Sequence, residues 1–230
     1  MIPLKDENPT EQFAWVNTAL IAINIAIFIY ELTLGARLTP FIMRYGYTPA
    51  AFLANPFSLA AISTVFTSMF LHAGFIHVGG NMLYLFIFGN NIEDLLGHWR
   101  YTLFYFLCGI GALAGHTISD PRSSIVSIGA SGAIAGILGA YIVLYPRARV
   151  LTVIPIFFFI QLAQLPAILV IGFWLLLQFI SGFTALTSQT AQTGGVAWFA
   201  HIGGFATGLA LIFLIPHRRP RPLPKEPREW

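Results

Sequence analysis

The chain has 230 residues, of which 57% are hydrophobic and only 9% are charged, and its formal net charge is +3. A soluble domain carries about 25% charged residues, so this composition excludes a soluble enzyme and indicates a membrane protein. The small net charge gives no indication of nucleic acid as a partner, and the single cysteine, Cys108, excludes a disulfide framework and a cysteine-based zinc cluster.

The gaps between charged residues measure the membrane spans, because one helix needs about 20 apolar residues to cross about 30 Å of hydrocarbon. The first uncharged gap predicts a span at about 13–34. The preceding acidic residues, Asp6, Glu7 and Glu11, are untypical of a signal peptide, so we expect this span to be retained.

The next uncharged gap, 45–92, is too long for one helix. Its first half contains prolines and predicts a loop with short helices, and its second half predicts the second span at about 64–89. The third span is expected at about 100–119 and a short fourth span at about 131–145.

The last uncharged gap, 150–216, needs two spans, which we expect near 151–182 and 196–216 on either side of a polar loop. The fold class is therefore an all-α polytopic membrane protein with six transmembrane helices around a short central fourth helix. Its expected parts are a cytoplasmic N-terminus at 1–12, a six-span domain at 13–216 and a basic, disordered cytoplasmic tail at 217–230.

Six spans place both termini on one side, together with nine of the twelve basic residues. The positive-inside rule then predicts that both termini are cytoplasmic and that the chain is a multi-pass protein of the cell (inner) membrane. The basic tail is expected to touch anionic lipid.

Polar residues inside a span are costly and are candidates for function. From Ser131 to Pro146, the inner end of the fourth span, is 15 residues or about 22 Å, and from His201 to His217 is 16 residues or about 24 Å. His77 falls near the same level on the second span. Three polar residues therefore share a depth several Å below the outer surface.

Spacing along the spans supports a single site. His77 and Asn81 share a helix face. Gly132, Gly204 and Gly208 are small residues that let membrane helices approach closely, so Ser131 and His201 on neighbouring spans could meet.

This arrangement permits nucleophilic catalysis, with Ser131 as the nucleophile and His201 as its base. Backbone N–H groups gather where a Gly-flanked turn enters the fourth span and could stabilise an oxyanion, with the side chains of His77 and Asn81 as further donors. Since no Asp or Glu occurs between Asp120 and Glu226, we expect a Ser–His dyad without an acidic third member.

Three segments taken together resemble the rhomboid family of intramembrane serine proteases, in the six-span form of bacteria and archaea. They are FLHAGFIHVGGNM at 70–82, GASG at 129–132 and AHIGGFATG at 200–208. The resemblance implies Ser131 as nucleophile and His201 as base. It assigns the oxyanion site to His77, Asn81 and the Ser131 backbone N–H. It makes His72 structural, beside the packing residues Gly129, Gly132, Gly204 and Gly208.

The resemblance also implies that the substrates are membrane-anchored proteins cut in or near their spans. Neither a metal nor another cofactor is expected. Two departures leave questions open. The first outer loop, about 35–63, lacks the Trp-Arg pair of some members, so its anchoring is undefined. Ala135 stands where some members have a Tyr under the histidine ring, so another group must support His201.

Two other function classes remain open from the sequence. One is an inactive rhomboid-like protein that binds client spans, and the other is a small proton or solute transporter with a histidine relay. For a protease, we expect a hydrated cavity that opens to the extracytoplasmic side. The loop 183–197 should cap it, with Gly194 and Gly195 as hinges.

Overall fold

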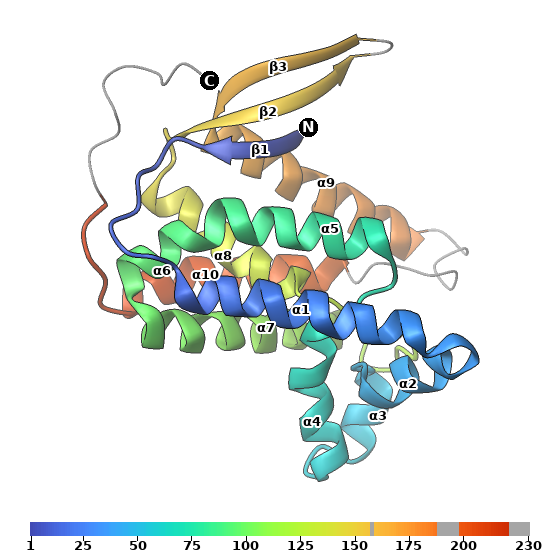
Figure 1. Cartoon of the computed structure of the whole chain (residues 1–230). Coiled ribbons are helices and arrows are strands. Elements are labelled where there is room, and N and C mark those ends of the chain that lie inside the picture. Colours follow the sequence, from blue (N-terminus) through green and yellow to red (C-terminus); the bar gives the residue numbers. More distant parts are fainter. Residues whose placement is uncertain (157–158, 188–197, 221–230) are drawn as a thin grey trace.

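The structure is a computed structural model that describes residues 1–156, 159–187 and 198–220. It is a helical bundle with a small β-sheet along one side (Figure 1). The helices of the bundle are α1 (Trp15–Thr33), α5 (Phe75–Tyr84), α6 (Asn90–Leu96), α7 (His98–Ser119), α8 (Ser131–Leu144), α9 (Ala167–Thr187) and α10 (Trp198–Leu214). The strands are β1 (Ile2–Asp6), β2 (Arg149–Ile156) and β3 (Phe159–Pro166).

Within the described residues, two helices are long and apolar enough to cross a membrane by themselves, namely α1 and α7. A third candidate span is a bent pair, Leu59–Phe70 with Phe75–Leu96, whose halves meet at 81°. It differs from the predicted helix at 64–89, because the chain breaks at 71–74 and then continues through a π-helical turn (Leu85–Gly89) into α6. The helices α8 and α10 and the Ala167–Ser181 part of α9 are apolar but shorter.

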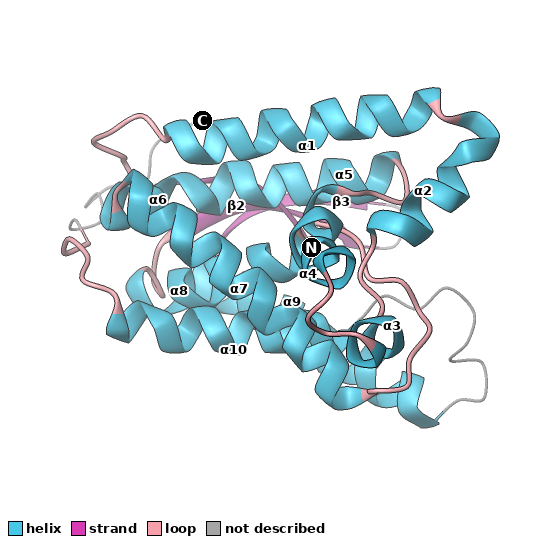
Figure 2. Cartoon of the chain, turned by 90° about the horizontal axis from the view of Figure 1, so that it is seen from below, coloured by secondary structure: helices cyan, strands magenta, loops and turns pink. Residues whose placement is uncertain are grey.

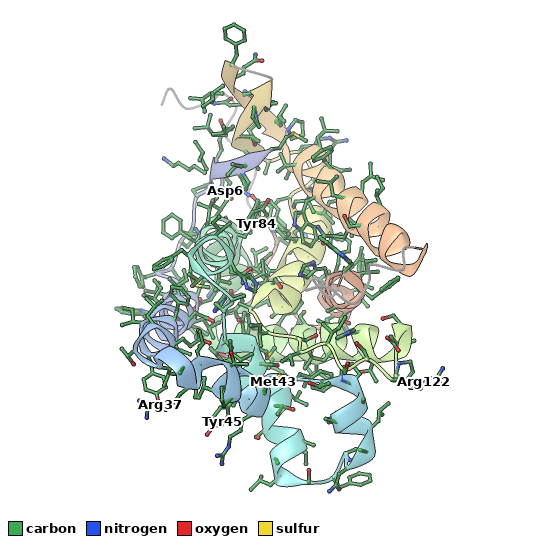
Figure 3. The ribbon with its side chains drawn as sticks, turned by 90° about the vertical axis from the view of Figure 1, so that its right-hand side faces the viewer. Asp6, Arg37, Met43, Tyr45, Tyr84 and Arg122 are labelled. Atoms are coloured by element: carbon green, nitrogen blue, oxygen red, sulfur yellow. The ribbon has the colours of Figure 1, made fainter. Side chains whose placement is uncertain are left out.

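The segment between α1 and α5 forms short helices, as the prolines predicted: α2 (Leu38–Tyr45), α3 (Pro49–Ala54) and α4 (Leu59–Thr67), with short 3₁₀ turns at Gly35–Arg37 and Ser68–Phe70. Figure 3 shows Arg37, Met43 and Tyr45 on the side of the molecule away from the sheet. The segment is anchored by Tyr47, whose backbone exchanges two hydrogen bonds with Ser127 and whose hydroxyl lies 2.7 Å from Thr117 Oγ1. Backbone pairing thus anchors the loop where the sequence offered no Trp-Arg pair.

The chain is mostly helical but not all-α, and the prediction of a helix over 151–182 is wrong in its first half. Instead, β2 and β3 pair antiparallel, with Arg149 opposite Pro166, and only from Ala167 is the chain helical. The N-terminal strand β1 pairs antiparallel with β2, placing Ile2 opposite Val153. The sheet order is β1-β2-β3.

The N-terminal strand is tied to the bundle by a buried carboxyl group. Asp6 Oδ2 accepts hydrogen bonds from the Tyr141 hydroxyl at 2.6 Å and from Asn91 Nδ2 at 2.7 Å. Figure 3 shows Asp6 where the sheet meets the helices. Burial raises the pKa of Asp6 to about 6, because desolvation disfavours the charged form. The expected cytoplasmic N-terminus is therefore an ordered part of the fold.

Acidic residues that follow the second span cap the first helix. The Glu93 carboxylate accepts from the backbone N–H groups of Val16 and Asn17, at 3.0 and 2.7 Å. Negative charge beside free N–H groups at a helix start is favourable. At the same end, Arg218 lies 3.7 Å from Glu11. The segments that flank the first and last helices thus meet at one end of the bundle.

The core lies between α7, α8 and α10. Figure 2 shows α7 crossing between the α1–α5 pair and the α8–α10 pair. Large aromatic residues fill this region: Tyr101, Phe104, Tyr105 and Tyr141 are fully buried. The candidates Ser131, His201 and His77 lie in the first turns of α8, α10 and α5, and Asn81 follows one turn after His77.

Candidate active site

Ser131 and His201 meet in the structure. Ser131 is the first residue of α8, and His201 lies in the first turn of α10. The distance from His201 Nε2 to Ser131 Oγ is 2.8 Å. This is a hydrogen bond of normal length, and it lets the imidazole accept the hydroxyl proton.

The two helices approach this closely because glycine faces glycine between them. A Cβ atom on Gly204 would collide with the backbone carbonyl of Gly132, and one on Gly208 would collide with the carbonyl of Gly136. A backbone carbonyl cannot swing away as a flexible side chain can. The small residues therefore set the spacing that brings the serine and the histidine together.

Gly129 brings the chain before the serine against the second candidate group. Its φ of 119° lies in a region that side-chain-bearing residues rarely adopt. Its N–H donates to the Ser68 carbonyl at 2.8 Å. A Cβ on Gly129 would lie 2.7 Å from His77 Nε2 and 3.4 Å from Asn81 Nδ2. The nitrogen atoms of these side chains therefore line the approach to Ser131.

The hydrogen bonds of His77 fix which of its nitrogens can donate. Its Nδ1 accepts from the backbone N–H of Ala73 at 3.3 Å. In a neutral imidazole the other nitrogen then carries the proton. His77 thus presents Nε2–H beside Gly129, which is the donor an oxyanion requires.

His72 holds Asn81 from behind. Asn81 Nδ2 lies 2.9 Å from His72 Nε2, so the amide spends one N–H on this bond and keeps the second. The backbone N–H of His72 donates to the buried Glu31 carboxylate of α1 at 3.2 Å. The structural position that the resemblance implied for His72 has a physical basis, because this residue orients Asn81 and anchors the 71–74 break to α1.

The ring of His201 has neighbours that the sequence analysis missed. Gln178 Oε1 lies 2.7 Å from its Nδ1, and the rings of Trp174 and Trp198 lie 5.7 and 6.3 Å away between centroids. These groups surround the His201 ring, for which the sequence offered no supporting residue because Ala135 stands in place of a Tyr. A signal was present, since Gln178 interrupts an apolar run from Ala167 to Ile180 and polar residues inside spans are candidates for function.

A cavity of about 750 Å³ joins these groups. His77, Asn81, Ser131, Gln178 and His201 all line it. Residues 183–187 of the expected capping loop belong to the end of α9, and residues 188–197, with Gly194 and Gly195, lie outside the described residues. In the described parts of the chain, no group of three or more His, Cys, Asp or Glu side chains is arranged to hold a metal ion.

A serine within hydrogen-bonding distance of a histidine, with N–H donors nearby, is an arrangement recognised by geometry rather than by chain order. Here it lies within a bundle of apolar helices. The Rhomboid domain family matches residues 60–218, more than half of the chain, and the chain belongs to the rhomboid family. Its membership, together with the apolar helices, identifies it as a membrane protein of a protease family.

Relatives in plants, fungi and bacteria carry rhomboid names. The chain is 27% identical over 245 residues to "RHOMBOID-like protein 6, mitochondrial" of Arabidopsis thaliana, covering 92% of this chain and 72% of the relative. It is 32% identical over 144 residues to "Rhomboid-type serine protease 2" of Emericella nidulans, covering 62% and 25%. It is 40% identical over 76 residues to "Putative rhomboid protease YdcA" of Bacillus subtilis, covering 33% and 38%.

Proposed function

We propose that this protein is an intramembrane serine endopeptidase that hydrolyses peptide bonds in or near the transmembrane segments of membrane-anchored proteins. The observation that carries the proposal is the 2.8 Å contact between His201 Nε2 and Ser131 Oγ inside the cavity. Family membership supports the same reading, since a relative of this chain is named a rhomboid-type serine protease.

In the proposed reaction, Ser131 Oγ attacks the scissile carbonyl carbon while His201 Nε2 takes the hydroxyl proton. The histidine then gives this proton to the leaving amine, and an acyl-enzyme remains on Ser131. Water, deprotonated by the same histidine, releases the acyl group. The N–H of Ser131, His77 Nε2–H and the second N–H of Asn81 stabilise the oxyanion in both halves of the reaction.

We further propose six spans, with the site open to the extracytoplasmic side. Nine of the twelve basic residues are expected at the end of the bundle where α1 starts, opposite Ser131, and the positive-inside rule makes that end cytoplasmic. The cell (inner) membrane remains the proposed location, although one relative is named mitochondrial and another comes from a bacterium.

The two alternatives make different demands on the site. A client-binding protein without activity has no need for a serine within hydrogen-bonding distance of a histidine, and this contact favours the enzyme. A proton relay needs ionisable groups that lead to the other end of the span. The cluster of His72, His77 and His201 lies at one end, where the helices α5 and α10 begin.

The test is cleavage of a single-span model substrate by the purified protein in detergent. Ser131→Ala and His201→Ala should each abolish cleavage, and the double variant should be no slower than either, because residues acting as one unit are strongly non-additive. Ser124→Ala, which changes an exposed serine outside the site, should cleave at the normal rate. A fluorophosphonate should label wild type and Ser124→Ala but not Ser131→Ala.

Substantial cleavage by Ser131→Ala would overturn the proposal. Absence of both labelling and cleavage in the wild type would favour the client-binding alternative, and proton flux into liposomes without proteolysis would favour the transporter.

A further inference from the structure

The buried amide of Gln178 has a defined partner on each side. Its Oε1 lies 2.7 Å from His201 Nδ1, and its Nε2 donates to the Trp174 carbonyl at 3.2 Å, one turn earlier on α9. Gln178 is 6% exposed, whereas its neighbours Leu177 and Phe179 are 42% and 52% exposed. The helix thus turns this one polar side chain inward and its apolar neighbours outward.

We propose that Gln178 is a positioning residue that holds the His201 imidazole in the tautomer a general base requires. This inference rests on the proposed function, and it adds a third member to the Ser131–His201 pair. The sequence predicts only a dyad, because no Asp or Glu occurs between Asp120 and Glu226.

The orientation of the amide follows from its donor. Because the Nε2 group faces the carbonyl of Trp174, the oxygen must face the imidazole. An oxygen only accepts, so Nδ1 of His201 carries the hydrogen. The opposite orientation would set oxygen against oxygen at Trp174, in a buried place where an unmade hydrogen bond is costly.

The tautomer of His201 decides whether Ser131 can be activated. With the hydrogen on Nδ1, the lone pair of a neutral ring is on Nε2, which faces Ser131 Oγ at 2.8 Å. With the hydrogen on Nε2, the ring could only donate to the serine and could not take its proton. Gln178 therefore acts on the hydroxyl through the far side of the ring.

An amide suits this position better than a carboxylate would. An ionised acid at this depth would have to be buried inside a span, where charge is expensive. The amide oxygen supplies orientation at lower cost, as the asparagine of papain-like proteases does beside its histidine. The amide carries no full charge, so it stabilises the imidazolium less than a carboxylate. We therefore expect Gln178 to contribute about 10- to 100-fold to the rate, the range typical of groups that orient a functional histidine.

Kinetics of three variants test the role. Gln178→Leu removes the acceptor, and kcat should fall about 10- to 100-fold with little change in KM. The acid limb of its pH–rate profile should move to lower pH, because the protonated ring loses a partner. Gln178→Glu keeps an acceptor and adds charge, so it should restore most of kcat and move the acid limb to higher pH. Gln161→Leu, an exposed glutamine on β3, is the matched control and should behave as wild type.

A second measurement does not depend on activity. In protein labelled with ¹⁵N-histidine, the His201 signals, assigned by their loss in His201→Asn, should report a hydrogen on Nδ1 in the wild type and a mixture of tautomers in Gln178→Leu. The hydrogen on Nε2 in the wild type, or an unchanged tautomer in Gln178→Leu, would overturn the proposal. So would a fall in kcat without movement of the acid limb. If the tautomers behave as expected but the wild type neither cleaves nor labels, the positioning role stands and the proposed function fails.

Discussion

At the scale of single residues, two separate hydrogen bonds hold the candidate oxyanion donors, one on His77 and one on Asn81. The Ala73 N–H sets the tautomer of His77, and His72 holds one N–H of Asn81. Each donor is thus fixed before any substrate arrives, which is the preorganisation that makes an oxyanion site effective.

We expect His77→Ala and Asn81→Ala each to lower kcat by about 10²–10³-fold without abolishing cleavage, because the loss of one oxyanion donor has that effect in other hydrolases. Steady-state kinetics with the model substrate check this. Fluorophosphonate labelling of Ser131, slowed but still detectable, would show that both variants are folded. An unchanged rate in both variants would move these residues to a purely structural role.

Residues whose chemistry is unusual for their surroundings could be predicted from the sequence. A serine and two histidines at one depth in apolar spans require an explanation, and the structure brings them together. Gln178 was not predicted as a site residue, because a neutral amide in an apolar helix is a weaker indication of function than an acid. The contact between Tyr47 and Ser127 could not be predicted, because it is made by backbone atoms and requires no particular side chains.

At the scale of elements, the contact of α8 with α10 carries the geometry of the site. The two helices touch through glycine backbones one residue away from Ser131 and three away from His201. Any added atom at this contact must separate the helices, and the separation would act directly on the 2.8 Å hydrogen bond.

Gly204→Ala should therefore lower both stability and activity. Its Cβ would strike the Gly132 carbonyl, and overpacking of this kind costs about 1–3 kcal/mol. Gly172→Ala is the matched control on α9, because its Cβ would meet nothing within 4 Å, and a helical Gly→Ala change should be neutral or stabilise by up to about 1 kcal/mol. Thermal unfolding in detergent and the cleavage rate measure both effects. Equal melting temperatures for the two variants would contradict the role given to the glycine contact.

The strands β2 and β3 lie where the sequence predicted the first half of a helix, and this prediction is wrong. An uncharged apolar run of this length reads equally well as a lipid-facing helix or as buried strands, because hydrophobicity alone does not separate them. The β-branched residues Val150, Val153 and Ile154 favour a strand, and the nearby Pro155 disfavours a helix interior. The length of an uncharged segment does not depend on these propensities, so span length alone could not distinguish the strands from a helix.

At the scale of the whole molecule, the polar site and the capped start of α1 lie at opposite ends of the bundle, since His72 bonds to Glu31 near the end of α1 and Glu93 bonds to Val16 at its start. Helix α8 begins at Ser131 in the site and ends at Leu144, shortly before β2 begins at Arg149. The orientation of this axis in the membrane decides on which side the proposed protease would cut its substrates.

Cysteine labelling in intact cells should resolve the orientation. In a Cys108→Ala background, Ser124→Cys should react with a membrane-impermeant thiol reagent, because Ser124 is exposed in the connection before α8. Arg147→Cys, exposed at the other end, should react only after permeabilisation. The parent variant should remain unlabelled under both conditions. The reverse pattern would place the site on the cytoplasmic side.

The pairing of β1 with β2 has a consequence for how the protein is made. Residues near Ile2 leave the ribosome first, yet their partners near Val153 are synthesised only after helix α8. Contacts so distant in sequence close slowly, and until then the unpaired strand can associate with the wrong partner. A bulky fusion at the N-terminus would burden this late step of assembly. Affinity tags for expression therefore belong at the C-terminal end of this sequence rather than before Met1.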